Sequence, residues 1–100
     1  MKFETVITYD GEPITLFFFR PDISEPIVIR GYDQQSHPWA TLTRVLANHP
    51  LQTGEVILDT NNIPGIDKVL EDKKLVEMTG RSANGEFCDY PIARVLVTLV

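Results

Sequence analysis

The chain has 100 residues, 43% of them hydrophobic and 23% charged, which is typical of one small globular domain and argues against intrinsic disorder. The formal net charge of -5 disfavours binding to a nucleic-acid backbone, because that interaction requires clustered Lys and Arg. The single cysteine, Cys88, excludes an internal disulfide, and no apolar run is as long as a signal-peptide core or a membrane span. We therefore expect a cytoplasmic protein.

An aromatic segment near the N-terminus dominates the first half of the chain. Residues 14–19 (ITLFFF) form a short β-rich run bounded by Pro13 and by residues 20–22 (RPD), which predicts a strand rather than a helix. Three consecutive aromatics place large side chains on both faces of this strand. Something must cover each face, either another part of the chain or a partner.

Residues 3–9 alternate between apolar and polar, and the Asp10-Gly11 dipeptide that follows favours a two-residue hairpin turn. Pairing Tyr9 with Glu12 fixes the register of the hairpin. The face predicted to join the core then carries Phe3, Ile7, Ile14, Leu16 and Phe18. The opposite face carries Glu4, Val6, Thr8, Thr15, Phe17 and Phe19. Two alternatives stay open for Phe17 and Phe19: cover by another element, or exposure as a contact patch flanked by Glu4 and Arg20.

The middle of the chain predicts a strand, a helix and another strand. Residues 21–26 read as a proline-containing loop and residues 27–30 as a third strand. Residues 38–48 predict an amphipathic helix that ends before Pro50. Residues 54–59 predict a fourth strand. The apolar stripe of the helix consists of Trp39, Leu42, Val45 and Leu46.

A second helix is predicted from about Pro64 to Lys74, with Ile66, Val69 and Leu70 on its buried stripe. Residues 75–81 and 86–100 then form a hairpin around the Asn84-Gly85 turn signal, with an edge position or a bulge expected at Tyr90-Pro91. Together these elements predict one α+β domain over residues 1–100. It consists mostly of an antiparallel sheet of about five to six strands, with two short helices.

We find no set of residues that suits catalysis. His37 and His49 bracket the first predicted helix, too far apart to share a metal, so we expect them to cap its ends. Cys88 follows Phe87 and reads as a small buried hydrophobe rather than a nucleophile. We predict that the protein is not an enzyme and that it has no cofactor.

Two further motifs fall short of a ligand site. Asp67 and Glu71 lie one helical turn apart, but no third oxygen ligand has useful spacing, so we expect a solvated face and no metal. Residues 80–85 (GRSANG) contain two glycines without the lysine or the strand-to-helix setting of a phosphate loop. Arg81 in this segment remains a candidate for contact with a partner.

Several segments of the second half resemble a known group of proteins. These segments are residues 61–66 (NNIPGI), Val69-Leu70, residues 79–81 (TGR) and residues 87–91 (FCDYP). The pattern is similar to that of small uncharacterised accessory proteins carried by conjugative elements and phages. The resemblance implies a mobile-element setting, in which some small acidic proteins disarm host defences.

Three function classes follow. The first is a small acidic protein-binding module that blocks a host defence complex, an anti-CRISPR-like or other anti-defence protein, by steric or electrostatic means. Its partner would be a host protein, for instance within a nucleic-acid-binding complex, with no direct nucleic-acid or membrane contact. The second is a small ligand-binding domain of unknown activity. The third is a homo-oligomeric structural or accessory subunit that pairs through residues 95–100. The candidate partner-binding residues are Phe17, Phe19, Glu4 and Arg81.

Overall fold

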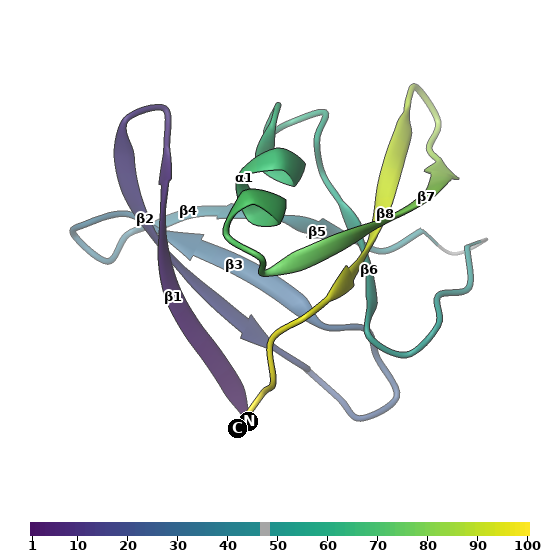
Figure 1. The fold of residues 1–100 in the computed structure, drawn as a ribbon, viewed down its shortest axis with the longest axis horizontal. Coiled ribbons are helices and arrows are strands. Elements are labelled where there is room, and N and C mark those ends of the chain that lie inside the picture. Colours follow the sequence, from purple (N-terminus) through teal and green to yellow (C-terminus); the bar gives the residue numbers. More distant parts are fainter. Residues whose placement is uncertain (47–48) are drawn as a thin grey trace.

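The N-terminal hairpin has the predicted register. The computed structural model describes residues 1–46 and 49–100 (Figure 1). Strands β1 (Lys2–Tyr9) and β2 (Glu12–Phe19) pair antiparallel with Tyr9 opposite Glu12. Asp10 and Gly11 both have positive φ angles, 51° and 79°, as the predicted turn requires. The hairpin therefore separates a core face from an outer face as the alternation predicts.

The remaining strands complete two antiparallel sheets, with orders β1-β2-β3-β4 and β5-β6-β8-β7 (Figure 1). The described residues contain eight strands and one short helix, against a prediction of five to six strands and two helices. The fold class, α+β with mostly antiparallel pairing, is confirmed. The further elements are β3 (Val28–Tyr32), β4 (Pro38–Thr41), β5 (Thr43–Arg44), β6 (Glu55–Leu58), α1 (Ile66–Asp72), β7 (Val76–Asn84) and β8 (Asp89–Val95).

The first predicted helix is wrong, because residues 38–44 form β4 and β5. Leu42 lies between these strands and connects the two sheets: its N–H donates to Ile29 O and its carbonyl accepts from Asp59 N–H, both at 2.8 Å. These long-range hydrogen bonds replace those of a helix. Thr41 and Thr43 are β-branched and suit extended backbone. Residues 47–48 of the predicted helix lie outside the described residues.

The second predicted helix is confirmed as α1. Ile66 and Leu70 are fully buried, and Val69 packs against the same core. Lys73 lies just after the last turn and donates from Nζ to the carbonyl of Val6 at 2.9 Å, which satisfies part of the free edge of β1. The Tyr9 hydroxyl donates to Pro64 O at 2.7 Å, so residues that flank both ends of the helix are hydrogen-bonded to this strand.

The C-terminal hairpin differs from its prediction in detail. Its strands run to Asn84 and resume at Asp89, so the turn comprises residues 85–88 and begins at Gly85 of the Asn84-Gly85 signal. Strand β8, which contains Pro91, is an inner strand between β6 and β7 and not an edge. The bulge lies in the partner strand β7, where residues 79–81 oppose Ile92 alone. The missing N–H of proline is thus tolerated beside an irregular part of the ladder.

The core lies between the two sheets and α1. Both chain ends meet at one side of the molecule (Figure 1), where Lys2 and Val100 exchange N–H···O hydrogen bonds of 3.0 and 3.1 Å. The fully buried side chains of the core include Ile7, Ile14, Leu16, Phe18, Ile29, Leu42, Leu58, Ile66 and Leu70. No helix in the described part of the chain is long and apolar enough to cross a membrane.

Candidate functional site

The outer face of the first sheet carries a cluster of aromatic side chains. Alternation along each strand directs one set of residues away from the core, and the pairing register arranges this set in rows. Phe17 lies between Glu4 on β1 and Arg30 on β3, and Thr15 lies between Val6 and Tyr32. We call this surface the aromatic face; it comprises Lys2, Glu4, Val6, Thr15, Phe17, Phe19, Val28, Arg30 and Tyr32.

The aromatic rings of this face contact one another and two cations. Phe17 and Tyr32 pack edge to face, with ring centroids 5.4 Å apart and an interplanar angle of 82°. Lys2 Nζ lies 5.3 Å from the centroid of the Phe17 ring, and Arg30 Cζ lies 5.1 Å from that of Phe19. Such contacts contribute about 0.5–1 kcal/mol each at exposed sites. They hold the rings in fixed orientations without another layer of structure above them.

This face is only partly shielded from solvent. Phe17, Phe19 and Tyr32 are half-buried, and Val6 is 48% exposed. A shallow depression of about 530 Å³ extends from the rings toward the loop after β3. Its lining comprises Lys2, Glu4, Thr15, Phe17, Phe19, Tyr32, Asp33 and Ser36. The aromatic rings therefore form the floor of an open surface with a charged rim.

The structure brings three of the four predicted contact residues together: Glu4, Phe17 and Phe19 all lie on the aromatic face. Arg20 was expected beside them, but its guanidinium donates to the Glu25 carbonyl at 2.7 Å. Sequence reasoning missed Lys2, Arg30 and Tyr32. Alternation in residues 27–32 could have found the last two, because Ile27, Ile29 and Gly31 face the core.

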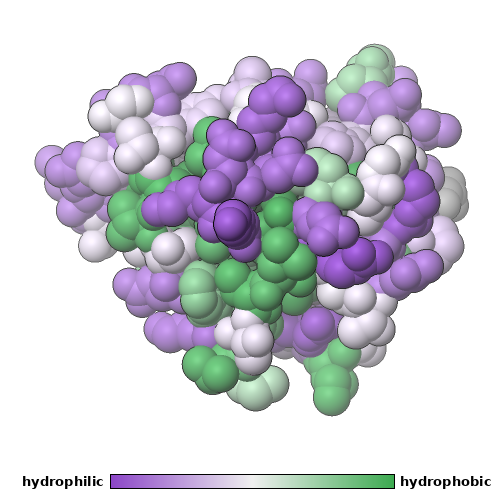
Figure 2. Space-filling model, in the orientation of Figure 1, coloured by the Kyte–Doolittle hydropathy of each residue, from purple (hydrophilic) through white to green (hydrophobic). Residues whose placement is uncertain are grey.

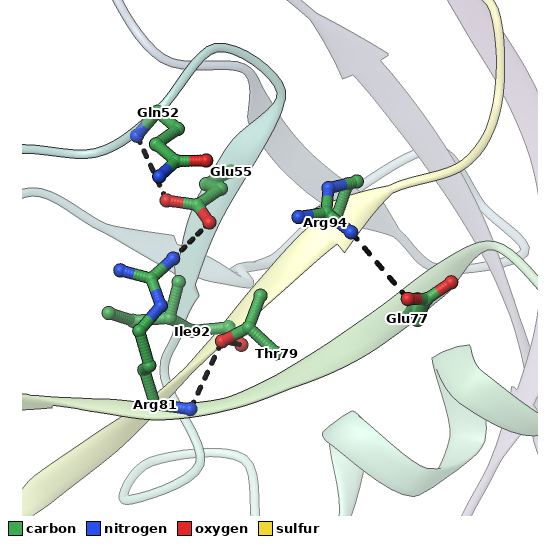
Figure 3. A network of polar contacts seen from close by, with 7 residues as sticks. All are labelled: Gln52, Glu55, Glu77, Thr79, Arg81, Ile92 and Arg94. Carbon is green, nitrogen blue, oxygen red and sulfur yellow. Dashed lines mark hydrogen bonds and ion pairs between the residues drawn. The ribbon is translucent and has the colours of Figure 1, made fainter.

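Arg81, the fourth predicted contact residue, lies in the other sheet and takes part in an ion pair (Figure 3). Its guanidinium reaches across β8 to the carboxylate of Glu55, a side chain that is 1% exposed. The second oxygen of Glu55 accepts the Gln52 N–H at 2.9 Å. The hydrogen bond from Arg81 has the larger effect and that from the Gln52 N–H the next, and both hold the pKa of Glu55 below its usual value. This geometry gives Arg81 a structural partner within the chain.

The bulge in β7 explains how Arg81 reaches Glu55. The Thr79 hydroxyl donates to Ile92 O at 2.8 Å and accepts the Arg81 N–H at 3.1 Å, which substitutes for ladder hydrogen bonds (Figure 3). Gly80 between them has a φ of 81°, a conformation that favours glycine. The three-residue bulge therefore redirects the side chain of Arg81 toward β6.

The histidines and Cys88 do not converge on one site. His37 is exposed and lies 3.8 Å from Asp33, whereas His49 Nε2 accepts the Asn84 N–H at 3.0 Å. The helix that they were expected to cap does not exist, so the capping prediction is wrong. Cys88 is half-buried and packs beside Tyr90. The pKa of Tyr90 is raised, mainly by a hydrogen bond with Cys88 and to a smaller extent by burial.

The described residues hold two other features that bear on ligands. A depression of about 510 Å³ is lined by residues from the segments 20–26 and 45–57, and two of its three Arg and Glu side chains, Arg20 and Glu55, are already bonded within the chain. Among the residues with assigned positions, no three His, Cys, Asp or Glu side chains are arranged to hold a metal ion. The aromatic face is thus the strongest candidate site.

The fold and this face together define a small two-sheet α+β protein with one uncovered aromatic sheet surface. Comparison with protein-family models, with curated protein sequences and with solved structures finds no match to the chain.

Proposed function

We propose that this chain is a small protein-binding module and that the aromatic face is its binding surface. One observation carries the proposal: three aromatic side chains stand half-exposed on a sheet face, with no other element of the described chain packed over them. Antiparallel sheets commonly leave one face to solvent, but that face is then usually polar. Phe17, Phe19 and Tyr32 depart from this pattern, and exposed aromatics of this kind mark interaction sites.

The composition of the face suits a protein partner better than a small molecule. Aromatic residues and Arg are enriched at the centres of protein interfaces, and a polar rim that excludes water surrounds them. Here Arg30 lies among the rings, while Lys2, Glu4 and Asp33 line the rim. Small-molecule sites are concave and enclose most of their ligand, whereas this depression is open.

The partner that we propose is a host protein, following the resemblance to accessory proteins of conjugative elements and phages. The net charge of -5 favours a basic partner through long-range attraction, as a nucleic-acid-binding defence complex would present. Binding would then inhibit this complex by blocking its surface, in the cytoplasm and without catalysis by the bound module.

The alternative from the sequence is homo-oligomerisation through pairing of residues 95–100. Part of this segment is already hydrogen-bonded within the chain. The Val95 N–H donates to Gly54 O, the Leu96 N–H donates to Leu75 O, and Val100 pairs with Lys2, all within one chain. Figure 2 shows apolar surface in the centre of its view, where the C-terminal segment runs, surrounded by hydrophilic residues. The backbone N–H groups of Val95, Leu96 and Val100 are therefore used within the chain, so self-association by strand addition would use another edge.

The test compares binding by two variants of the full chain. Phe17→Ser combined with Phe19→Ser removes two rings from the face, and Phe87→Ser removes a ring that is 92% exposed in the β7-β8 turn. We expect the double variant to lose capture of host defence complexes by at least tenfold while Phe87→Ser binds like the wild type. Equal binding by the folded double variant would refute the proposal.

A further inference from the structure

We propose that the aromatic face also pairs with the same face of a second copy of this chain, which gives a two-fold symmetric homodimer. The inference rests on the proposed function, because it assumes that this face binds protein, and it names one such partner. Strands β1, β2 and β3 carry the charges and apolar side chains that would form this interface.

The charge of the face permits self-association even though the whole chain is acidic. Two copies with a net charge of -5 repel each other at long range. Around the aromatic rings, however, the cations Lys2 and Arg30 balance the anions Glu4 and Asp33. The excess negative charge therefore lies elsewhere on the molecule, and this face approaches a copy of itself without local repulsion.

The charged residues of the central row are placed for pairing between copies and not within one. Glu4 and Arg30 flank Phe17 on opposite sides, because β2 pairs with β1 at Glu4 and with β3 at Arg30. They are separated by two strand spacings, about 10 Å, which exceeds the reach of a salt bridge. Both side chains are exposed. Neither forms an ion pair with another described residue, and the Arg30 guanidinium lies over the ring of Phe19.

A two-fold axis parallel to β2 satisfies both charges at once. When two sheets stack face to face, this axis lies in the plane between them and exchanges the positions of β1 and β3. Glu4 of one copy then faces Arg30 of the second copy, and the reverse pair forms on the other side of the axis. The two Phe17 rings meet at the centre, where burial of aromatic surface contributes most.

The neighbouring rows are compatible with the same axis. Val6 of one copy lies over Tyr32 of the second copy, which pairs an aliphatic side chain with a ring. Lys2 lies over Val28 of the second copy, where its aliphatic stem makes the contact while the ammonium group remains in water. No row places two like charges against each other. The face is therefore complementary to itself in this one orientation.

The experiment uses charge reversal in the full-length chain, with the oligomeric state measured by sedimentation velocity over roughly two decades of micromolar concentration, which suits a small interface. The wild type should be a concentration-dependent dimer. Glu4→Arg and Arg30→Glu should each be monomeric, because two like charges then face each other across the axis. Glu86→Arg makes the same charge change at an exposed position of the β7-β8 turn and should dimerise like the wild type.

Mixing the two charge-reversed variants gives the most decisive test of the homodimer. A mixture of equal amounts of the Glu4→Arg and Arg30→Glu variants should form a heterodimer, because each reversed charge then meets an opposite charge on the other copy. Both substitutions in one chain should also restore the dimer. Circular dichroism establishes whether each variant is folded. If Glu4→Arg is unfolded, Glu4→Lys takes its place, and if Arg30→Glu is unfolded, Arg30→Asp takes its place.

The outcomes separate this inference from the proposed function. A wild type that stays monomeric, a Glu4→Arg variant that still dimerises, or a mixture that stays monomeric overturns the homodimer. If the wild type is monomeric and the Phe17→Ser/Phe19→Ser variant loses only host-protein capture, the proposed function stands and its occupant is heterologous. If that variant neither changes capture nor changes self-association, both proposals fall.

Discussion

Gly31 shows how one residue without a side chain organises the core face of the first sheet. A Cβ at this position would lie 2.8 Å from Trp39 Cε3 and 3.0 Å from Ile14 Cγ2. The bulge between β3 and β4 brings Trp39 into this space, where its ring also packs 5.3 Å from that of Tyr9. The absence of a side chain at Gly31 is therefore a requirement for the position of Trp39.

Gly31→Ala should consequently lower the free energy of unfolding by about 1–3 kcal/mol, the usual cost of overpacking a dense core. Chemical denaturation followed by Trp39 fluorescence measures this change. Gly54→Ala is not a matched control, because Gly54 has a positive φ of 85°. An unchanged midpoint for Gly31→Ala would show that Trp39 can move away at no cost.

The absence of catalysis is a second prediction about single residues. Cys88→Ala, His37→Ala and His49→Ala should each leave the biological effect of the protein essentially intact, because these side chains do not converge with a nucleophile and a base. The measurement is the effect of each variant at matched protein level, after its folding has been established. Loss of the effect in any one folded variant would refute this prediction.

At the scale of elements, the Glu55–Arg81 pair connects β6 to the bulge of β7. Arg81 keeps the pKa of Glu55 low, so the pair stabilises the fold above the ordinary glutamate pKa of about 4.3, and this contribution disappears as the pH falls through the lower, folded value. Arg81→Ala leaves Glu55 buried without its cation and should cost about 1–3 kcal/mol at neutral pH.

The difference in unfolding free energy between wild type and Arg81→Ala should therefore shrink on acidification. Denaturant titrations of both proteins at several pH values from neutral to strongly acidic measure this dependence. Arg94→Ala is the graded comparison, since Arg94 pairs at 3.5 Å with the exposed Glu77, lies opposite Glu55 and lowers the pKa of Glu55 less than Arg81 does. It should change stability by less than about 1 kcal/mol. A pH-independent difference for Arg81→Ala would contradict the assigned role of the pair.

The elements also show where sequence reasoning succeeds. The Asp10-Gly11 turn fixes the register of the first hairpin, so the separation of Phe18 from Phe17 and Phe19 followed from local information alone. The helix expected over residues 38–48 failed because the hydrogen bonds of Leu42 to Ile29 and Asp59 are long-range. An apolar stripe with helical spacing does not reveal a chain that crosses from one sheet to another.

Of the candidate site, only the part that lies on the first hairpin was predictable from the sequence. Glu4, Phe17 and Phe19 share the hairpin, whereas Arg30 and Tyr32 join them only through the pairing of β2 with β3. The eight residues 20–27 between these strands do not form a tight turn, so they do not fix the register. Arg81 lies in the other sheet, and its pairing with the buried Glu55 could not be read from the sequence, because the two residues are 26 positions apart.

In the whole molecule, the inner faces of the two sheets form the core, and the outer face of the first sheet is the proposed binding surface. The inner faces bury the large apolar residues, and Phe18 there is fully buried. Phe18→Ala should cost about 3–5 kcal/mol, a large share of the total for a domain of this size. Trp39→Ala, at a half-buried position against the same core, should cost somewhat less. Denaturation midpoints measure the effect of both substitutions. An unchanged midpoint for Trp39→Ala would show that Trp39 belongs to the surface and not to the core.

The central claim is that Phe17 and Phe19 serve binding and not the fold, and one comparison within a single strand tests it most directly. Phe17→Ser combined with Phe19→Ser and Phe18→Ser alone are compared for unfolding free energy and for binding. We expect the double variant to stay folded, to lose about 1–2 kcal/mol at most, and to bind no longer, while Phe18→Ser loses most of its stability. A double variant that unfolds would show that these rings belong to the chain's own core and would contradict the account.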